Sequence, residues 1–238
     1  MRDKRTYRYL AAFLFLSAAA AALFVMNACI GSVGISLPEI VRALRRAGEE
    51  TAVRILWDIR LPRAAAAMIL GGALALAGYL LQTFFHNPIA GPFVLGISSG
   101  AKMTVALVMI WLMGRSVRVT SAAMILSAFV GAMLSMGFVL LLSRRMKGMS
   151  MLVVAGVMIG YICSAVTDLV VTFADDAQIV NLHNWSQGSF SGMTWENVQV
   201  MAWVTAAASL AVFFLSKPLD AYRLGETYAQ NMGVNIRL

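Results

Sequence analysis

The 238-residue sequence contains few charged residues, few cysteines and few histidines. Asp, Glu, Lys and Arg make up 13 % of it, whereas 60 % is hydrophobic and the mean hydropathy is +0.78. A soluble globule needs more polar surface than this, so we expect a lipid environment. Cys29 and Cys163 lie in apolar runs and have no metal-ligand spacing with His86 or His183. The sequence therefore predicts no disulfide, no metal site and no cofactor.

The sequence also lacks a glycine-rich phosphate-binding loop followed by Lys-Ser or Lys-Thr. ATP hydrolysis would therefore have to be carried out by another chain. The net charge of +8 does not indicate nucleic acid, because the Lys and Arg residues, apart from Lys102, lie between hydrophobic runs and form no basic face with interleaved aromatic residues. We expect membrane lipid, and no nucleic acid, around these basic residues.

Hydrophobic runs that are long enough to cross a bilayer recur along the chain. A hydrocarbon core of about 30 Å takes roughly 20 apolar residues in a helix. Six runs fit, of which the third and the sixth are the least regular: residues 10–30, 64–85, 94–113, 119–142, 151–174 and 198–215. The first run follows a basic start, as in a secretory signal, but its length favours a retained helix. We predict an all-α, polytopic transmembrane helix bundle that forms a single domain over residues 1–238.

Basic residues near the ends of these runs predict the orientation of the chain. The N-terminal tail, the loop after residue 142 and the C-terminal tail are rich in Lys and Arg, which places them in the cytoplasm. The loop 175–197 contains no Lys or Arg but contains two tryptophans, as outer loops do. The loop between the first two runs conflicts with this assignment because it holds six arginines: Arg42, Arg45, Arg46, Arg54, Arg60 and Arg63.

Residues 36–46 of that loop have an amphipathic pattern. Their apolar residues recur at helical spacing, opposite the arginines: Leu37, Ile40, Val41 and Leu44. Ser36 and Glu39 match a capping box at the start of such a helix. We expect a short helix on the outer surface, which either faces lipid headgroups or is an ordinary loop helix without a function of its own.

Small and polar residues form a stripe along the fifth run: Gly156, Gly160, Ser164, Asp168 and Thr172. An ionised Asp in mid-membrane costs about 2.5 to 3.5 kcal/mol, so Asp168 should face the bundle interior or water. Two interpretations stay open, because Asp168 either lines a pathway or is hydrated near the outer end of its helix. A membrane-embedded enzyme would need a catalytic partner for Asp168, and no Asp, His or Ser motif supplies one.

The segment between the second and third runs, residues 86–100, contains two prolines and three glycines, which prevent a plain helical hairpin. An irregular backbone at membrane depth is tolerated only where it is buried in protein or lines a cavity, and such segments often mark transport sites. A simple turn in the cytoplasm is the alternative.

Four segments occur in an order that is typical of one transporter family. Residues 59–63 read Ile-Arg-Leu-Pro-Arg, residues 87–92 lead into Leu-Gly-Ile-Ser-Ser-Gly-Ala at 95–101, and residues 185–196 carry Trp185, Gly-Ser-Phe-Ser-Gly and Trp195. The fourth segment holds Leu224-Gly225-Glu226, Ala229 and Met-Gly-Val-Asn at 232–235. Together they resemble the permeases of the iron-siderophore, haem and cobalamin importer family, whose members import their cargo across the bacterial inner membrane.

The resemblance implies a ten-helix ABC-importer permease with a cytoplasmic N-terminus. Its implied partners are two cytoplasmic ATP-binding subunits, a periplasmic or lipid-anchored substrate-binding protein and a second permease subunit. We expect a ferric siderophore as cargo, with haem and cobalamin as alternatives. Because the four helices of the second half are absent from the sequence, it is expected to be a fragment, or else a truncated protein that does not transport alone.

The resemblance also assigns roles to individual residues. The ATPase-coupling residues would be Leu224, Gly225, Glu226, Ala229, Gly233 and Val234. Arg60 and Arg63 would dock acidic residues of the binding protein. The pathway and gate residues would be Asn87, Pro88, Ile89, Gly96, Ser98, Ser99, Gly100 and Asp168. The coupling segment itself predicts a short helix from Pro218, a break at Gly225 and a second helix that ends at Gly233.

Overall fold

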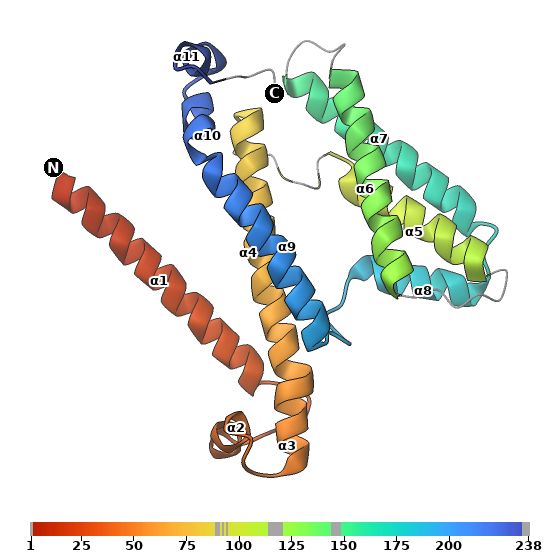
Figure 1. Ribbon diagram of the computed structural model, residues 1–238. Helices are drawn as coiled ribbons and strands as arrows, with labels where there is room; N and C mark the ends of the chain where they lie inside the picture. The colour runs from red at the N-terminus through yellow and green to blue at the C-terminus, as the bar shows by residue number, and fades with distance from the viewer. Residues whose placement is uncertain are drawn as a thin grey trace. The chain divides into compact units, whose positions relative to one another are not determined.

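The computed structural model describes residues 2–88, 91, 93, 95–113, 121–143 and 149–234. These residues form helices and connecting turns with no strand among them (Figure 1), which confirms the all-α prediction. The elements are α1 (Arg2–Cys29), α2 (Leu37–Leu44), α3 (Glu50–Arg54), η1 (Ile55–Arg60), α4 (Leu61–Phe85), α5 (Ile97–Met113), α6 (Ser121–Ser143), α7 (Met149–Val171), α8 (Asp176–Gln187), α9 (Trp195–Phe214), α10 (Ser216–Arg223) and α11 (Glu226–Asn231).

Each of the six predicted hydrophobic runs corresponds to a helix over most of its described residues, but the number of membrane spans is approximate. Among the described residues, five helical segments are long and apolar enough to cross a bilayer: Lys4–Cys29, Glu50–Phe85, Ala122–Leu142, Met151–Val171 and Trp195–Phe214. The third run corresponds to α5, which has 17 residues and is therefore about 25 Å long. This length is just below the hydrocarbon thickness of about 30 Å.

The chain divides into two compact units. The first comprises residues 1–73 and 190–213, and the second comprises residues 74–189 and 214–238. Each unit has its own apolar core. The assignment of the whole chain to a single domain stays a prediction.

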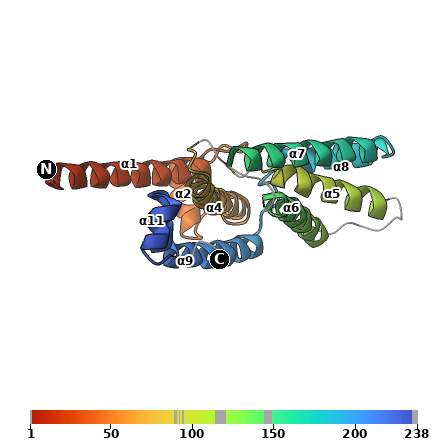
Figure 2. The same cartoon turned by 90° about the horizontal axis from the view of Figure 1, so that it is seen from above.

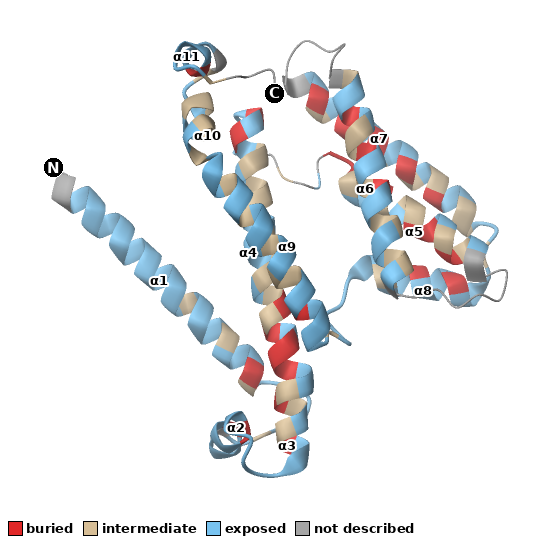
Figure 3. Cartoon of the chain, viewed as in Figure 1, coloured by how far each residue is buried: buried red, intermediate tan, exposed pale blue. Residues whose placement is uncertain are grey.

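In the first unit, α1 presents nearly its whole length to the surroundings (Figure 3). Its exposed side chains are mostly apolar, as expected for a helix that faces lipid. The last two turns of α1 contact a buried apolar cluster: Ala28, Ile40, Ala43, Ala52, Leu56 and Leu61. This cluster joins the end of α1 to α2, α3 and the start of α4.

The short helix expected over residues 36–46 is present as α2. The backbone N–H and the hydroxyl of Ser36 both donate to Glu39 Oε2, at 2.9 and 2.8 Å, which confirms the capping box. On the opposite side, the indole N–H of Trp57 donates to the carbonyl of Ala43 at 3.0 Å, and the Arg46 guanidinium lies 4.9 Å from the Trp57 ring centroid. These contacts hold α2 against η1.

The capping box of α2 should make the helix sensitive to acid. The hydrogen bond from the Ser36 backbone and that from the Ser36 hydroxyl hold the pKa of Glu39 below its ordinary value. A carboxyl group whose pKa is lower in the folded chain stabilises it above the unfolded pKa, and this stabilisation is lost as pH falls through the folded pKa. Below about pH 4.3, α2 should therefore loosen. The ratio of the amide exchange rate over residues 36–46 in the wild type to that in Glu39→Gln should rise on acidification. A ratio that does not change with pH would contradict this prediction.

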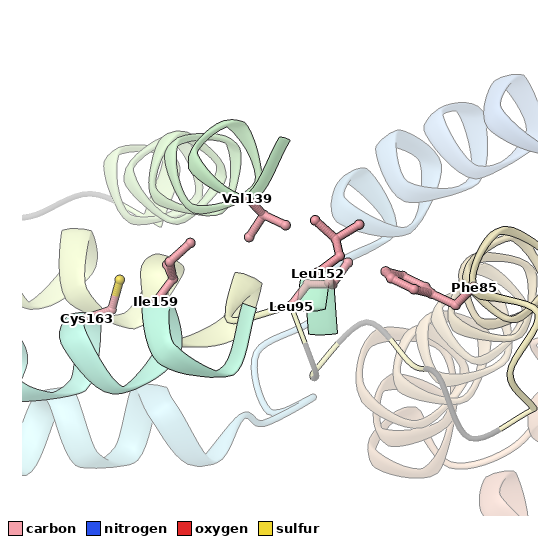
Figure 4. Packing of buried hydrophobic residues seen from close by; sticks show 6 residues of the cluster. All are labelled: Phe85, Leu95, Val139, Leu152, Ile159 and Cys163. Carbon is pink, nitrogen blue, oxygen red and sulfur yellow. The ribbon is translucent and has the colours of Figure 1, made fainter. Parts of the chain in front are cut away.

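In the second unit, α5, α6 and α7 pack side by side, and α8 covers part of α5 (Figures 1 and 2). One buried cluster lies between these helices and the end of α4 (Figure 4): Phe85, Leu95, Val139, Leu152, Ile159 and Cys163. A second cluster joins α5 to α8 through Val105, Ala106, Met109 and Leu182. Helix α5 is therefore the central helix of this unit.

Candidate functional site

The coupling segment, predicted over residues 218–236, forms two short helices, and the structure describes it as far as residue 234. Gly225, with φ of +118°, separates α10 from α11, and Gly233, with φ of +80°, follows the end of α11. The backbone N–H of Val234 donates to the carbonyl of Ala229 at 3.0 Å and closes the last turn. Ala229 is fully buried within this segment. The predicted break at Gly225 and the predicted stop at Gly233 are confirmed, and the first helix begins two residues before Pro218.

Large apolar side chains lie on the surface of this coupling segment. The exposed fractions are 69 % for Leu224, 48 % for Tyr228 and 64 % for Met232. They recur every four residues: Leu224 directly follows α10, Tyr228 lies in α11 and Met232 directly follows α11. Exposed apolar side chains that cluster in this way are typical of a protein contact surface.

The C-terminal end of α4 lies against the coupling segment within the second unit. His86, with φ of +49°, places its Nε2 at 3.1 Å from the carbonyl oxygen of Tyr222. The Phe84 and Tyr222 rings stack at 6.4 Å between centroids, and Arg223 lies 5.9 Å from the Tyr79 ring centroid. These contacts join the end of α4 to α10.

The predicted gate residues Asn87 and Pro88 line a cavity of about 300 Å³ at this junction. The other lining residues are Tyr79, Gln82, Thr83, His86 and Arg223. The structure thus brings two of the three gate residues next to the coupling segment. The third, Ile89, lies outside the described residues.

The signature segment at 95–100 positions α5 against its neighbours. Gly96 has φ of +68°, and a Cβ atom there would lie 2.7 Å from the Gly156 carbonyl oxygen and 2.8 Å from the Gly160 nitrogen of α7. Similarly, a Cβ on Gly100 would lie 2.7 Å from the Gly131 carbonyl oxygen of α6. The two glycines therefore allow the backbones of α5, α6 and α7 to touch.

The polar residues of this segment have different surroundings. Ser98 is exposed, whereas Ser99 is half-buried beside Gly160. The carbonyl of Gly96 accepts a hydrogen bond from the Ser135 hydroxyl at 3.1 Å, so this buried carbonyl has a hydrogen-bond partner inside the bundle. Of the pathway residues predicted here, Ser98 is the one with an exposed side chain, while Gly96 and Gly100 serve helix packing.

The stripe on α7 is used in two ways. Its small end, at Gly156 and Gly160, packs against Gly96, as the predicted small-residue stripe implies. Its polar end is different, because Asp168 is exposed, and the Thr172 hydroxyl donates to the backbone carbonyl of Asp168 at 2.9 Å. The pathway role of Asp168 stays a prediction.

The two arginines that are predicted to dock the binding protein differ in exposure within the first unit. Arg60 is 7 % exposed, and its guanidinium donates to the carbonyls of Ala28 at 3.1 Å, Cys29 at 2.7 Å and Val33. Arg63 is exposed, and both arginines line a cavity of about 330 Å³ beside Phe190. Because Arg60 is already bonded to the end of α1, Arg63 is the better candidate for an outside partner.

Two features of the site region were missed from the sequence. Residues 175–197 read as an outer loop, but residues 176–187 form α8, whose capping box places Gln178 Oε1 at 3.1 Å from the Asp175 nitrogen. The spacing of Asp175 and Gln178 could have revealed it. The π-helical turn η1, which aims Arg60 at α1, has no comparable sequence signal.

A compact coupling segment, a close-packed signature segment and apolar spans thus occur together in one chain. The sequence profile of the FecCD transport family matches residues 19–238. The chain belongs to the FecCD transport family. It is a multi-pass membrane protein, and its glycine-rich signature is the helix-packing element of this family member.

Relatives of this FecCD chain are known in archaea and bacteria. It is 32 % identical over 216 residues to a protein of Methanocaldococcus jannaschii named as an ABC transporter permease, covering 87 % of this chain and 62 % of that protein. It is 37 % identical over 194 residues to the vitamin B12 import system permease protein BtuC of Serratia proteamaculans, covering 79 % and 56 % of the two chains. The chain thus spans little more than half the length of these relatives.

A solved structure has the same fold. It is described as an inward-facing conformation of a metal-chelate type ABC transporter, and it superposes with a TM-score of 0.81 at 24 % identity. The match covers 96 % of this chain and 70 % of the other. The chain therefore shares the fold of this ABC transporter structure over the matched residues.

Proposed function

We propose that this chain forms part of the permease subunit of an ABC importer in the bacterial inner membrane, with its N-terminus in the cytoplasm. The observation that carries the proposal is the FecCD family match over residues 19–238. As cargo we propose a ferric siderophore or a related iron chelate. Cobalamin is the second candidate, because several relatives are named vitamin B12 import permeases.

The proposed assembly has three kinds of partner. Two ATP-binding subunits supply the energy, since the sequence contains no phosphate-binding loop. A substrate-binding protein delivers cargo from outside and docks at Arg63, where an exposed guanidinium suits a carboxylate. A second permease subunit completes the pathway.

The contacts in the second unit support a route for coupling. In this proposal the exposed apolar residues of α10 and α11 sit in a cleft of the ATP-binding subunit and follow its movement. Tyr222 passes the movement to His86 through the 3.1 Å contact and ring packing. Asn87 and Pro88, next along the chain, then open or close the path.

Uptake into proteoliposomes tests the function and separates the two cargoes. The assay uses the chain with its ATP-binding and substrate-binding partners. ATP-dependent accumulation of a ferric chelate without accumulation of cyanocobalamin would support iron transport. The reverse result would assign cobalamin, and accumulation of neither would refute the proposed function.

Charging the coupling surface should uncouple the ATPase. Leu224→Asp together with Met232→Asp places two carboxylates where the partner cleft would be apolar, and burying an unpaired charge is costly. We expect stimulation of ATP hydrolysis by loaded binding protein to fall at least about tenfold, because truncating interface anchors commonly costs more than 1 kcal/mol each.

The matched control is Gln230→Ala, which changes an exposed polar residue of α11. It should keep normal stimulation. Membrane insertion and helix content should be unchanged in both variants, since the altered side chains are exposed. Normal stimulation in the doubly charged variant would remove α10 and α11 from the ATPase interface.

A further inference from the structure

Lys102 is the single charged residue in the sequence of α5, an otherwise apolar helix. It lies five residues after the helix start at Ile97, and its side chain is exposed. The ion pair found among the described residues is that of Arg54 with Glu50. Within that part of the chain, Lys102 therefore has no acidic partner. A charged side chain within a membrane-spanning helix is expensive unless it meets water or an opposite charge.

The helical spacing shows which face of α5 carries Lys102. Ser98, four residues earlier, is also exposed on this face. Val105, Ala106 and Met109, at three, four and seven residues after Lys102, continue the same face. These three residues are buried against Leu182 of α8.

The other sides of α5 are occupied by helices. Gly100 meets Gly131 of α6, and Gly96 meets Gly160 of α7. The face with Ser98 and Lys102 is therefore turned away from α6 and α7. One turn further along α5, the same face is covered by α8.

Helix α8 has the composition of a helix in contact with water. It carries Asp176, Asn181, His183, Asn184 and Gln187. Gln178 of α8 lies 3.5 Å from the carbonyl of Ile110, so α8 is bonded directly to α5. A polar helix over this face is expected to bring water to it, whereas a lipid-facing strip would be covered by apolar groups.

We propose that Lys102 lines the transport path and binds an anionic group of the cargo, with Ser98 as a neighbouring hydrogen-bond donor. This inference rests on the proposed transport function and narrows its cargo to a metal chelate with net negative charge. An ammonium group in a path of low dielectric attracts an anion more strongly than it would in bulk water. Because the cargo needs to be bound only briefly while it crosses the membrane, the single cation of Lys102 is sufficient.

Cysteine accessibility tests whether this face meets water, and it does not depend on transport. Lys102→Cys is made in a chain with Cys29→Ser and Cys163→Ala, and the membrane-embedded chain is treated with an anionic, water-soluble methanethiosulfonate. The control is Leu107→Cys, which is also exposed but is turned roughly 140° around α5. A thiol reacts as its thiolate, which forms in water and not in lipid.

We expect Lys102→Cys to be labelled at least about tenfold faster than Leu107→Cys. Ser98→Cys, on the same face, should be labelled like Lys102→Cys and supplies the answer if the latter variant does not fold. Equal or slower labelling at residues 98 and 102 would overturn the inference, because Lys102 would then extend to the lipid headgroups.

Cargo charge tests the role of Lys102 in transport. Uptake of an anionic ferric tris-catecholate is compared with uptake of a neutral ferric tris-hydroxamate, using the chain with its partners. Lys102→Gln should lower uptake of the anionic chelate about tenfold and spare the neutral one, and Lys102→Arg should restore it. Equal effects on both chelates, or none, would overturn the inference. Uptake of neither chelate by the wild-type assembly would instead refute the proposed iron cargo, while the labelling result would still stand.

Discussion

Gly96→Ala should separate α5 from α7 and destabilise the second unit by several kcal/mol. The added methyl group would lie 2.7 Å from the Gly156 carbonyl oxygen and 2.8 Å from the Gly160 nitrogen, and both atoms belong to a helix backbone that has little freedom to move. Overpacking of this kind typically costs about 1 to 3 kcal/mol. The left-handed backbone at Gly96, with φ of +68°, adds roughly 1 to 2 kcal/mol for any residue with a Cβ.

Thermal unfolding of the purified chain in detergent would measure this effect. The matched control is Gly137→Ala in α6, where an added methyl group meets no atom within 4 Å and where alanine favours the helix. We expect a much lower unfolding midpoint for Gly96→Ala and a normal or slightly raised midpoint for Gly137→Ala. Equal midpoints would show that α5 and α7 do not touch at this glycine.

Arg60→Gln should weaken the attachment of α1 by about 3 kcal/mol or more. The guanidinium donates to the carbonyls of Ala28, Cys29 and Val33. A hydrogen bond to a charged group contributes roughly 1.5 to 3 kcal/mol, and the carbonyls at the end of a helix have no partner within that helix. The positive charge also offsets the negative end of the α1 dipole. Glutamine is shorter and neutral, so it cannot replace these contacts.

Two further variants sharpen this test. Gly31→Ala should act in the same direction, because a Cβ at Gly31 would lie 2.6 Å from an Arg60 guanidinium nitrogen. Arg54→Gln is the control, since Arg54 forms an exposed ion pair with Glu50 at 2.8 Å that is worth about 0.3 to 0.5 kcal/mol. Protease resistance of residues 30–50 reports the release of α1. If Arg60→Gln and Arg54→Gln are equally resistant, Arg60 does not hold α1.

Local patterns were sufficient to predict the parts of the structure that depend on neighbouring residues. The apolar runs predicted the long helices, the spacing of Ser36 and Glu39 predicted the start of α2, and Gly225 and Gly233 predicted the limits of α11. Each of these features depends on hydrogen bonds or burial within a few residues. They are therefore visible in a single sequence.

Features that depend on distant residues were not predictable in this way. Arg60 read as an outward-facing docking residue, whereas its partners Ala28 and Cys29 lie about 30 positions earlier in the chain. Gly96 read as part of an irregular segment lining a path, but its requirement for a glycine comes from the backbone of α7. The sequence marks such positions as unusual, and only the tertiary contact shows why.

The hydrogen bonds between Arg60 and the end of α1 have a consequence for biosynthesis. Arg60 follows Cys29 by 31 residues in the chain, so α1 reaches the membrane before its partner does. During that interval the helix must be stable in the bilayer by its own hydrophobicity, which its apolar, exposed length allows. Attachment then follows when the next span begins to insert, and the order of synthesis is also the order of assembly.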